Sequence, residues 1–217
     1  MVAGNIPGTK VLNFDATGYI DCGTSFDVGG RAEAALGIWL STEDHFADAN
    51  YAISKDAQIA IQHYGTDDRI RFGVHIDGSW QWVTSDANIS PMYGRTFAMG
   101  VYDATNLLLY VNGKIHKTQT RTGAVAAIDA SAAHLYIAAK TSASGYFHGV
   151  LAEAMAWTRS VSAQEVQELY FFPLARLVKK SASPLLVWES NFTVHVIDGD
   201  YSLFSGVNVQ FHVVDGS

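Results

Sequence analysis

The sequence predicts an all-β fold built from many short strands. Of its 217 residues, 48% are hydrophobic and only 16% are charged, and Asp outnumbers Glu by fifteen to six. Long-helix proteins carry many Glu and Lys, whereas Asp favours turns. Between Val11 and Tyr146 the chain also switches repeatedly between alternating apolar segments and turn residues. That pattern is typical of a sandwich or a barrel.

Composition excludes several classes of protein. The chain is too apolar and too weakly charged to be disordered. Its net charge of -7, with no run of Lys or Arg, argues against nucleic acid as a partner. No stretch is apolar for the roughly 18 to 20 residues of a membrane span.

The first residues and the single cysteine bear on localisation. Met1 to Lys10 has neither the charged nor the apolar part of a signal peptide, so we expect synthesis in the cytoplasm. Cys22 has no second cysteine with which to form an internal disulfide, and we interpret it as a buried free thiol.

Eleven strands are expected in the first two thirds of the chain. Asn112-Gly113 separates two of them and is a strong hairpin signal, because both residues accept the positive φ of a type I′ turn. The expected strands are Val11–Phe14, Tyr19–Cys22, Ala34–Leu40, Ala52–Lys55, Gln58–Tyr64, Ile70–Ile76, Trp80–Thr84, Phe97–Tyr102, Leu107–Val111, Lys114–Thr118 and His134–Ala138.

One short helix is predicted after Arg159. Ser162 and Glu165 have the spacing of a capping box, in which each side chain bonds to the backbone N–H of the other residue. Val166, Leu169 and Tyr170 would form its apolar face. Pro173 is expected to end the helix, since proline disfavours helix in the residue before it.

Residues 176–217 are expected to be a linker followed by a β-hairpin extension. Phe192–Ile197 and Val207–Val213 alternate as strands do. So short a unit is marginal alone, so we expect it to pack on the main domain or on a partner. His195 and His212 would pair across the two strands or lie at a subunit interface, rather than bind a metal. The apolar residues assigned to assembly are Phe192, Val194, Val207, Val209 and Phe211.

Several segments are similar, in order and spacing, to one family. Val11–Gly23 resembles the opening strands of laminin-G-like members of the concanavalin A-like lectin/glucanase superfamily, and Ile38–Leu40 resembles their next strand. Leu109–Lys114 resembles their hairpin, and Tyr146–Glu165 their final strand and capped helix. The resemblance covers about residues 10 to 170. It implies a two-sheet antiparallel jelly-roll sandwich, which we place at residues 1–175.

Two further details qualify the resemblance. Many relatives carry Asp immediately before the Glu of the final strand, whereas this chain has Ala152, so any loop or ion that the Asp supports in relatives lacks that support. Leu169–Val178 is similar to the segment that follows such domains in many tailed-bacteriophage proteins. The first point weakens an ion site, and the second suggests a virion context by analogy.

Catalysis by the glycosidases of this superfamily requires two carboxylates on one strand or on facing strands. Glu153 is the only Glu at a core-strand position, and no acidic partner is found for it. We interpret Glu153 as a structural residue bonded to backbone or to an arginine. We expect no enzymatic activity.

Calcium is the one ion that the resemblance implies, since laminin-G-like domains often bind it through loop oxygens. The candidate ligands are Asp77, Asp103 and Asn106, with the Asp198-Gly199-Asp200 turn as a further candidate. Such residues are also what tight turns need, and we favour that interpretation. The eight histidines show no zinc spacing, and no cofactor is required.

Aromatic residues are the remaining candidates for binding. Trp80 and Trp82 lie two apart, so both point to one face of their strand and would offer a platform on which a sugar stacks. The alternative, which we favour, is that they fill the core beside Trp39. Weaker candidates for sugar contact are Tyr51, Tyr64 and Tyr93.

The sequence therefore favours a non-enzymatic, lectin-like structural protein of a phage virion, on the capsid or the tail. Its partners would be other virion subunits or further copies of itself, with a cell-surface glycan as a second ligand. The alternatives are a free-standing carbohydrate-binding module and a divergent glycosidase.

Overall fold

The computed structural model describes residues 12–43, 50–89, 94–121 and 126–171, and the backbone of 194–198, 202–203 and 210–212. The elements in these ranges are β1 (Leu12–Asp15), β2 (Tyr19–Asp21), β3 (Glu33–Thr42), β4 (Asn50–Lys55), β5 (Ile59–Tyr64), β6 (Arg69–Ile76), β7 (Ser79–Thr84), β8 (Thr96–Asp103), β9 (Asn106–Val111), β10 (Lys114–Thr120), β11 (Leu135–Ile137), β12 (His148–Trp157), α1 (Ala163–Phe171), β13 (Val194–Asp198), β14 (Ser202–Leu203) and β15 (Gln210–His212).

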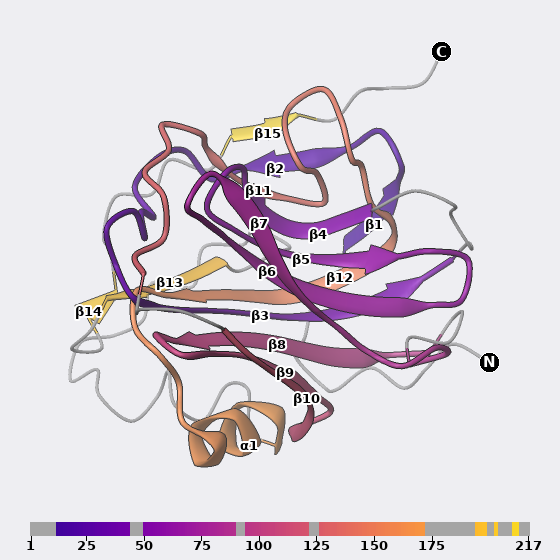
Figure 1. Ribbon diagram of the computed structural model, residues 1–217. Helices are drawn as coiled ribbons and strands as arrows, with labels where there is room; N and C mark the ends of the chain where they lie inside the picture. The colour runs from indigo at the N-terminus through magenta and orange to yellow at the C-terminus, as the bar shows by residue number, and fades with distance from the viewer. Residues whose placement is uncertain are drawn as a thin grey trace.

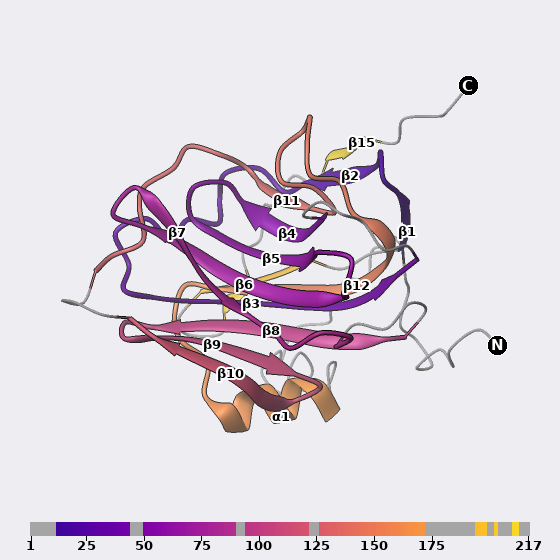
Figure 2. The ribbon, with the colours of Figure 1, turned by 45° about the vertical axis from the view of Figure 1, so that its right-hand side comes forward.

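The strands form a seven-stranded and an eight-stranded sheet that pack face to face, and α1 lies on the outer side of the eight-stranded sheet (Figures 1 and 2). The seven-stranded sheet has the order β15-β2-β11-β4-β5-β6-β7. The eight-stranded sheet has the order β10-β9-β8-β3-β12-β13-β14, and β1 also pairs with β12. Every described pair is antiparallel except β12 with β13. The predicted all-β sandwich of jelly-roll type with one short helix is confirmed.

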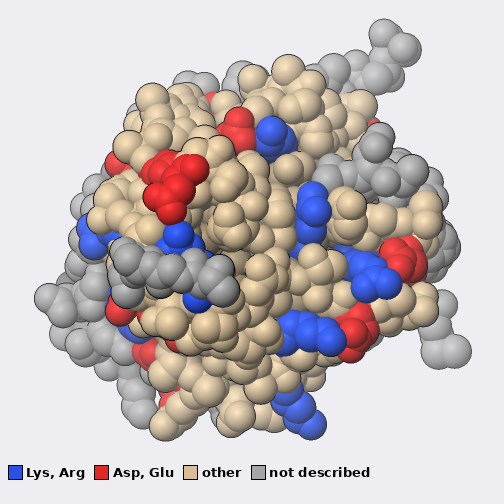
Figure 3. Space-filling model, in the orientation of Figure 1, with Lys and Arg blue, Asp and Glu red and all other residues tan. Residues whose placement is uncertain are grey.

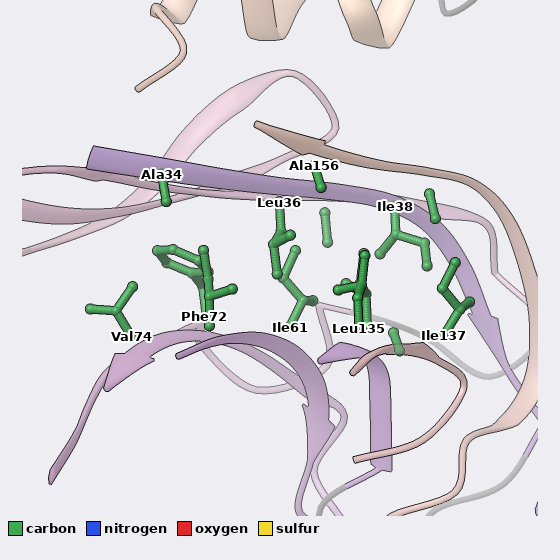
Figure 4. Close-up of a cluster of buried hydrophobic side chains, with 14 of the residues drawn as sticks. Ala34, Leu36, Ile38, Ile61, Phe72, Val74, Leu135, Ile137 and Ala156 are labelled. Atoms are coloured by element: carbon green, nitrogen blue, oxygen red, sulfur yellow. The ribbon is translucent and has the colours of Figure 1, made fainter. Parts of the chain in front are cut away.

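Along the strands, apolar side chains at every second position point between the sheets, and these side chains form the core. Figure 4 shows Ala34, Leu36 and Ile38 of β3 facing side chains of the seven-stranded sheet, among them Phe72 of β6. All of these side chains are fully buried. Burying each large apolar side chain contributes about 1.5–3 kcal/mol, so this layer dominates the stability of the sandwich. Cys22 also lies in it, as expected.

Two local motifs of the sequence are confirmed. Asn112 and Gly113 have φ angles of 50° and 77° and join β9 to β10, as a type I′ hairpin requires. At the start of α1, Ser162 N–H donates to Glu165 Oε2 at 2.9 Å, and Glu165 N–H donates to Ser162 Oγ at 3.3 Å. Arg159 holds the same carboxylate through both of its terminal nitrogens.

The helix covers the outer face of the eight-stranded sheet. Its Tyr170 ring stacks on Trp39 of β3 at 5.5 Å and lies near Phe97 of β8. Val166 and Leu169 are buried in the same cluster, as predicted. Phe171 is the last described residue of α1, and Pro173 lies outside the described residues. Within the described part of the chain, no helix has the length and apolar character needed to span a bilayer.

Strand β12 lies inside the eight-stranded sheet and pairs with three other strands. One of its edges pairs with β3, while the other pairs first with β1 along His148–Leu151 and then with β13 along Ala154–Trp157. The register with β3 shifts between Ala152 and Met155, and Glu153, inside this bulge, has a φ of 49°. A bulge bends its strand, which lets two different segments share one edge.

The expected pairing of the tail strands with each other is wrong. Strand β13 joins the eight-stranded sheet and forms a hairpin with the short β14, whereas β15 pairs with β2 in the other sheet. His195 and His212 therefore lie in different sheets. The physical reason is that β12 and β2 each offer an edge that a tail strand can pair with. Val194 lies in β13 and Phe211 in β15, while Phe192, Val207 and Val209 lie outside the described residues.

Candidate functional site

The outer face of the seven-stranded sheet collects aromatic and polar side chains. In β6, Ile70, Phe72 and Val74 point into the core, so the residues between them point outward. Pairing between β6 and β7 places Trp82 opposite Gly73 and Trp80 opposite His75. Both tryptophans therefore lie on the outer face.

The favoured interpretation that Trp80 and Trp82 fill the core beside Trp39 is wrong. Both are only partly buried, and Trp39 belongs to the other sheet. Alternation showed correctly that they share a face. Alternation alone does not show which of the two faces of β7 packs on the core. Only one face does, and β7 is the last described strand of its sheet.

Four planar side chains stack in one row on this face. The Trp80 and Trp82 rings are 4.7 Å apart and inclined by 19°. Arg71 Cζ lies 4.2 Å from the centre of the Trp82 ring and 3.7 Å from the centre of the Tyr64 ring. We call Tyr64, Arg71, Trp82 and Trp80 the aromatic row. Tyr64, at one end, is 39% exposed.

Gly73 makes this arrangement of the row feasible. A Cβ atom on Gly73 would lie 2.3 Å from Trp82 Cε3 and 2.6 Å from its Cζ3. The indole of Trp82 thus lies against Gly73, in space that the side chain of any other residue would occupy. This close approach positions Trp82 between Trp80 and Arg71.

Polar groups lie beside the aromatic row in β4 and β5. Gln62 stands opposite Arg71 on one side and Tyr51 on the other, and its Oε1 accepts from Arg71 Nη2 at 3.2 Å. Gln62 is fully buried, and its Nε2 has no hydrogen-bond partner. Ser54 is also fully buried, and its Oγ has no hydrogen-bond partner. Tyr51 is almost fully buried, and burial raises the pKa of its phenol.

A histidine–carboxylate pair borders the row at Trp80. The His75 ring meets the Trp80 ring edge-on at 5.4 Å, and His75 Nδ1 lies 2.7 Å from Asp129 Oδ2. The same Asp129 oxygen accepts from the N–H of Gly78 at 2.9 Å. The Gly78 hydrogen bond, followed by that of His75, lowers the pKa of Asp129.

A second aromatic group lies toward the other edge of the same sheet. The Tyr136 ring of β11 meets Tyr19 edge-on at 5.6 Å and stacks with His134 at 5.9 Å. Asp21 of β2 lies 2.8 Å from His134 Nδ1 and accepts from the N–H of Gly23. The carboxylate of Asp21 is thus held by two donors.

Among the sugar-contact candidates, Trp80, Trp82 and Tyr64 come together in the row, and Tyr51 lies two strands away from Arg71. Tyr93 lies outside the described residues. Arg71 and Gln62 were not identified from the sequence. The signal that would have found them is the β5–β6 register, which sets Gln62 opposite Arg71 and follows from the turn between the two strands.

The calcium candidates are engaged by protein donors. Asp77 has a φ of 53° in the β6–β7 turn, and its Oδ2 accepts from Arg121 at 2.9 Å. Asp103 Oδ1 accepts from the N–H groups of Thr105 and Asn106. These contacts are turn chemistry. No cluster of three His, Cys, Asp or Glu occurs in the described residues. Asp198 ends β13, and residues 199–200 lie outside the described ranges.

Glu153 is remote from the aromatic row. It lies in the β12 bulge of the other sheet and is only 8% exposed. Its charge raises the pKa of Arg95, although burial of that guanidinium lowers it more. Arg95 in turn lies 4.6 Å from the centre of the Trp39 ring.

On the visible face in Figure 3, acidic and basic side chains occur only in small groups with broad uncharged areas between them.

Comparisons with known proteins agree with this fold. A sequence model described as the concanavalin A-like lectin/glucanases superfamily matches residues 14–167. No curated protein matches the chain.

Three solved structures illustrate the likeness of the fold. The native heptameric SAP-like pentraxin from Limulus polyphemus has a TM-score of 0.59 at 14% identity, over 98% of each chain. A candidate carbohydrate binding protein from Bacteroides ovatus ATCC 8483 has a TM-score of 0.56 at 14% identity, over 74% of this chain and 46% of the other. The botulinum neurotoxin serotype D binding domain has a TM-score of 0.55 at 9% identity, over 76% and 42%.

Proposed function

Because this chain belongs to the concanavalin A-like lectin/glucanases superfamily, we propose that it is a non-enzymatic carbohydrate-binding protein whose binding surface is the outer face of β4–β7. The observation that carries the proposal is the aromatic row, since aromatic rings with polar neighbours suit the mixed surface of a pyranose. The Bacteroides ovatus relative, described as carbohydrate binding, has a similar fold.

The stacking limits where a sugar makes contact. Trp82 has Trp80 on one side and Arg71 on the other, so neither of its ring faces is available. The outer faces of Tyr64 and Trp80, at the two ends of the row, are the surfaces on which a pyranose stacks. Arg71 and the ring edges between them supply polar contacts.

The distribution of carboxylates supports binding without hydrolysis. Glycosidases of the two-carboxylate type hold those groups roughly 5 to 9.5 Å apart around the scissile bond. Strands β4 to β7 contain no Asp or Glu. Asp129 borders the row, and its Oδ2 is engaged by His75 and the N–H of Gly78. Asp21 lies toward the other edge of this sheet, and Glu153 lies in the other sheet.

Glycan-array screening followed by calorimetry tests the proposal. Trp80→Ala and Tyr64→Ala should each weaken binding of any saccharide that the wild type binds, while each variant keeps a cooperative thermal unfolding transition. Phe171→Ala is the matched control, because Phe171 is 65% exposed on α1, beyond the opposite sheet. Absence of saccharide binding by the wild type, or equal loss in the control, would refute the proposal.

For the place of action, we propose the surface of a phage virion, with other subunits or further copies of the chain as partners. Support comes from the resemblance of Leu169–Val178 to phage proteins. The addition of β13–β14 and β15 to the two sheets also makes the tail part of the surface available for assembly. A free-standing binding module is the alternative.

Deleting residues 181–217 should abolish oligomerisation or incorporation into particles while the remaining sandwich stays folded by circular dichroism. Light scattering on the full chain is the companion measurement, because it does not depend on how the truncated chain folds. A monomeric full chain, or a truncated chain that still assembles, would favour the free-standing module.

A further inference from the structure

Within the described residues, Arg71 differs from the other half-buried arginines in having no acidic partner. Arg69 Nε bonds to Asp67 at 2.7 Å, Arg121 to Asp77 at 2.9 Å, and Arg159 to Glu165 at 2.9 Å. Arg95 has the charge of Glu153 nearby. In the described part of the chain, no carboxylate lies within 4.0 Å of Arg71; Tyr64 and Tyr51 are the ionisable neighbours that affect it.

An unpaired cation at this position calls for an explanation, because burying a charge without a counter-charge is costly. The chain has 21 acidic against 14 basic residues, so acidic partners are in excess. Burial lowers the pKa of Arg71, but an arginine still keeps its charge at neutral pH. The rings of Tyr64 and Trp82 offset part of the cost through cation–π contacts.

Two donors, one in the guanidinium of Arg71 and one beside it, also lack acceptors. Arg71 Nε is buried and has no hydrogen-bond partner. Gln62 is fully buried and uses its Oε1 to accept from Arg71 Nη2, which leaves its Nε2 without a partner. Buried polar groups are normally satisfied, but none of the described residues supplies an acceptor to these two donors.

The stacking also selects the shape of the acceptor. A guanidinium donates its hydrogen bonds within its own plane. The Tyr64 and Trp82 rings, 3.7 and 4.2 Å from Arg71 Cζ, limit the directions from which an acceptor can approach it. A carboxylate is flat and matches the arginine fork with two oxygens. Resting on the proposed function, we infer that the aromatic row binds an acidic saccharide, a uronic or sialic acid, whose carboxylate is held by Arg71 and whose ring stacks on Tyr64 or Trp80.

Calorimetry on matched saccharide pairs tests this inference. One pair is sialyllactose and lactose; the other is trigalacturonic acid and its methyl ester, which keeps the backbone but loses the charge. We expect the acidic member of one pair to bind about tenfold more tightly than its neutral counterpart. The pair that shows this preference distinguishes a sialic acid from a uronic acid.

Substitutions then assign the preference to Arg71. Arg71→Gln should bring the affinity ratio within the pair close to one, and Arg71→Lys, which keeps the charge but not the fork, should restore it only in part. Arg69→Gln, two residues earlier on the same strand and ion-paired, is the control and should keep the ratio.

The experiments distinguish failure of this inference from failure of the proposed carbohydrate binding. Equal affinity of the wild type for acidic and neutral members would overturn the inference and leave carbohydrate binding intact, whereas no binding of any saccharide would overturn both. Equal weakening of both members by Arg71→Gln would show that Arg71 only supports the stack, against the inference. The wild-type comparison decides the matter even where a variant does not fold.

Discussion

Substitution of Gly73 by alanine is the sharpest test of the aromatic row. The new Cβ would lie 2.3, 2.6 and 2.7 Å from three atoms of the Trp82 ring, closer than non-bonded carbons approach. Gly73 is not among the positive-φ glycines, so alanine fits the backbone and only the contact is disturbed. We expect the indole to leave its place and the stacks with Trp80 and Arg71 to be lost.

Gly73→Ala should lower the free energy of unfolding only slightly but change the circular dichroism spectrum clearly. The aromatic pair contributes about 0.5–1.5 kcal/mol and the cation–π contact about 0.5–1 kcal/mol. Replacing a strand glycine returns about 0.5–1 kcal/mol. The net loss is therefore about 1 kcal/mol, or about 3 °C in Tm. The circular dichroism couplet of two stacked indoles should disappear, and saccharide affinity should fall with it.

Gly37→Ala is the matched control. Gly37 is also within a strand, and a Cβ there would make ordinary contacts of 3.5–3.7 Å with Met155, Trp157 and Met99. It should be neutral or slightly stabilising. If Gly73→Ala behaves in the same way and keeps the couplet, Trp82 does not lie against Gly73 and the four side chains do not form the aromatic row.

Four further outcomes are expected. Burial raises the pKa of Cys22 to about 12, so its thiol should react with a thiol reagent only after unfolding; rapid reaction of native protein contradicts this. The pKa of Asp129 lies below its ordinary value of 3.8, so its contribution to stability is present above that value and is lost as pH falls through the folded pKa. Asp129→Asn should therefore flatten the acid limb of stability against pH, and an unchanged limb refutes the assignment. Ser162→Ala removes the acceptor for Glu165 N–H and should cost about 1 kcal/mol in urea unfolding; no loss means that the cap contributes nothing. If calcium binds at Asp77, titration should raise Tm in the wild type but not in Asp77→Ala, and no shift in either counts against a site.

Local motifs could be predicted from the sequence because the interactions that define them are local. The Asn112-Gly113 turn needs only two residues that accept positive φ, and the Ser162–Glu165 box lies within one helical turn. The strands of the sandwich follow in the same way from alternation and turn residues.

The aromatic row could be predicted only in part. Alternation places Trp80 and Trp82 on one face but does not say whether that face is buried. Arg71 and Tyr64 reach the tryptophans across two strand pairings, so their neighbours depend on register as well as on spacing. The small size of Gly73, which admits Trp82, has meaning only once its cross-strand partner is known.

The pairing partners of the tail strands could not be predicted from their sequence pattern. Phe192–Ile197 and Val207–Val213 alternate in the same way, which suggested that they pair with each other. Pairing partners are decided by which edges are open, and β12 and β2 lie far from the tail in sequence. Parallel addition of β13 to β12 leaves no signature in either segment.

The central place of β12 sets the order in which the chain can fold during synthesis. Leu12 pairs with Leu151 and Ala35 with Trp157, so these contacts await nearly the last residues of the sandwich. Until β12 leaves the ribosome, β3 has β8 as its only sheet neighbour, and β1 has none in the described part of the chain. Closing such distant contacts is slow. The nascent protein therefore exposes unpaired strand edges until β12 has been made, and such edges are the sites at which chains pair wrongly with one another.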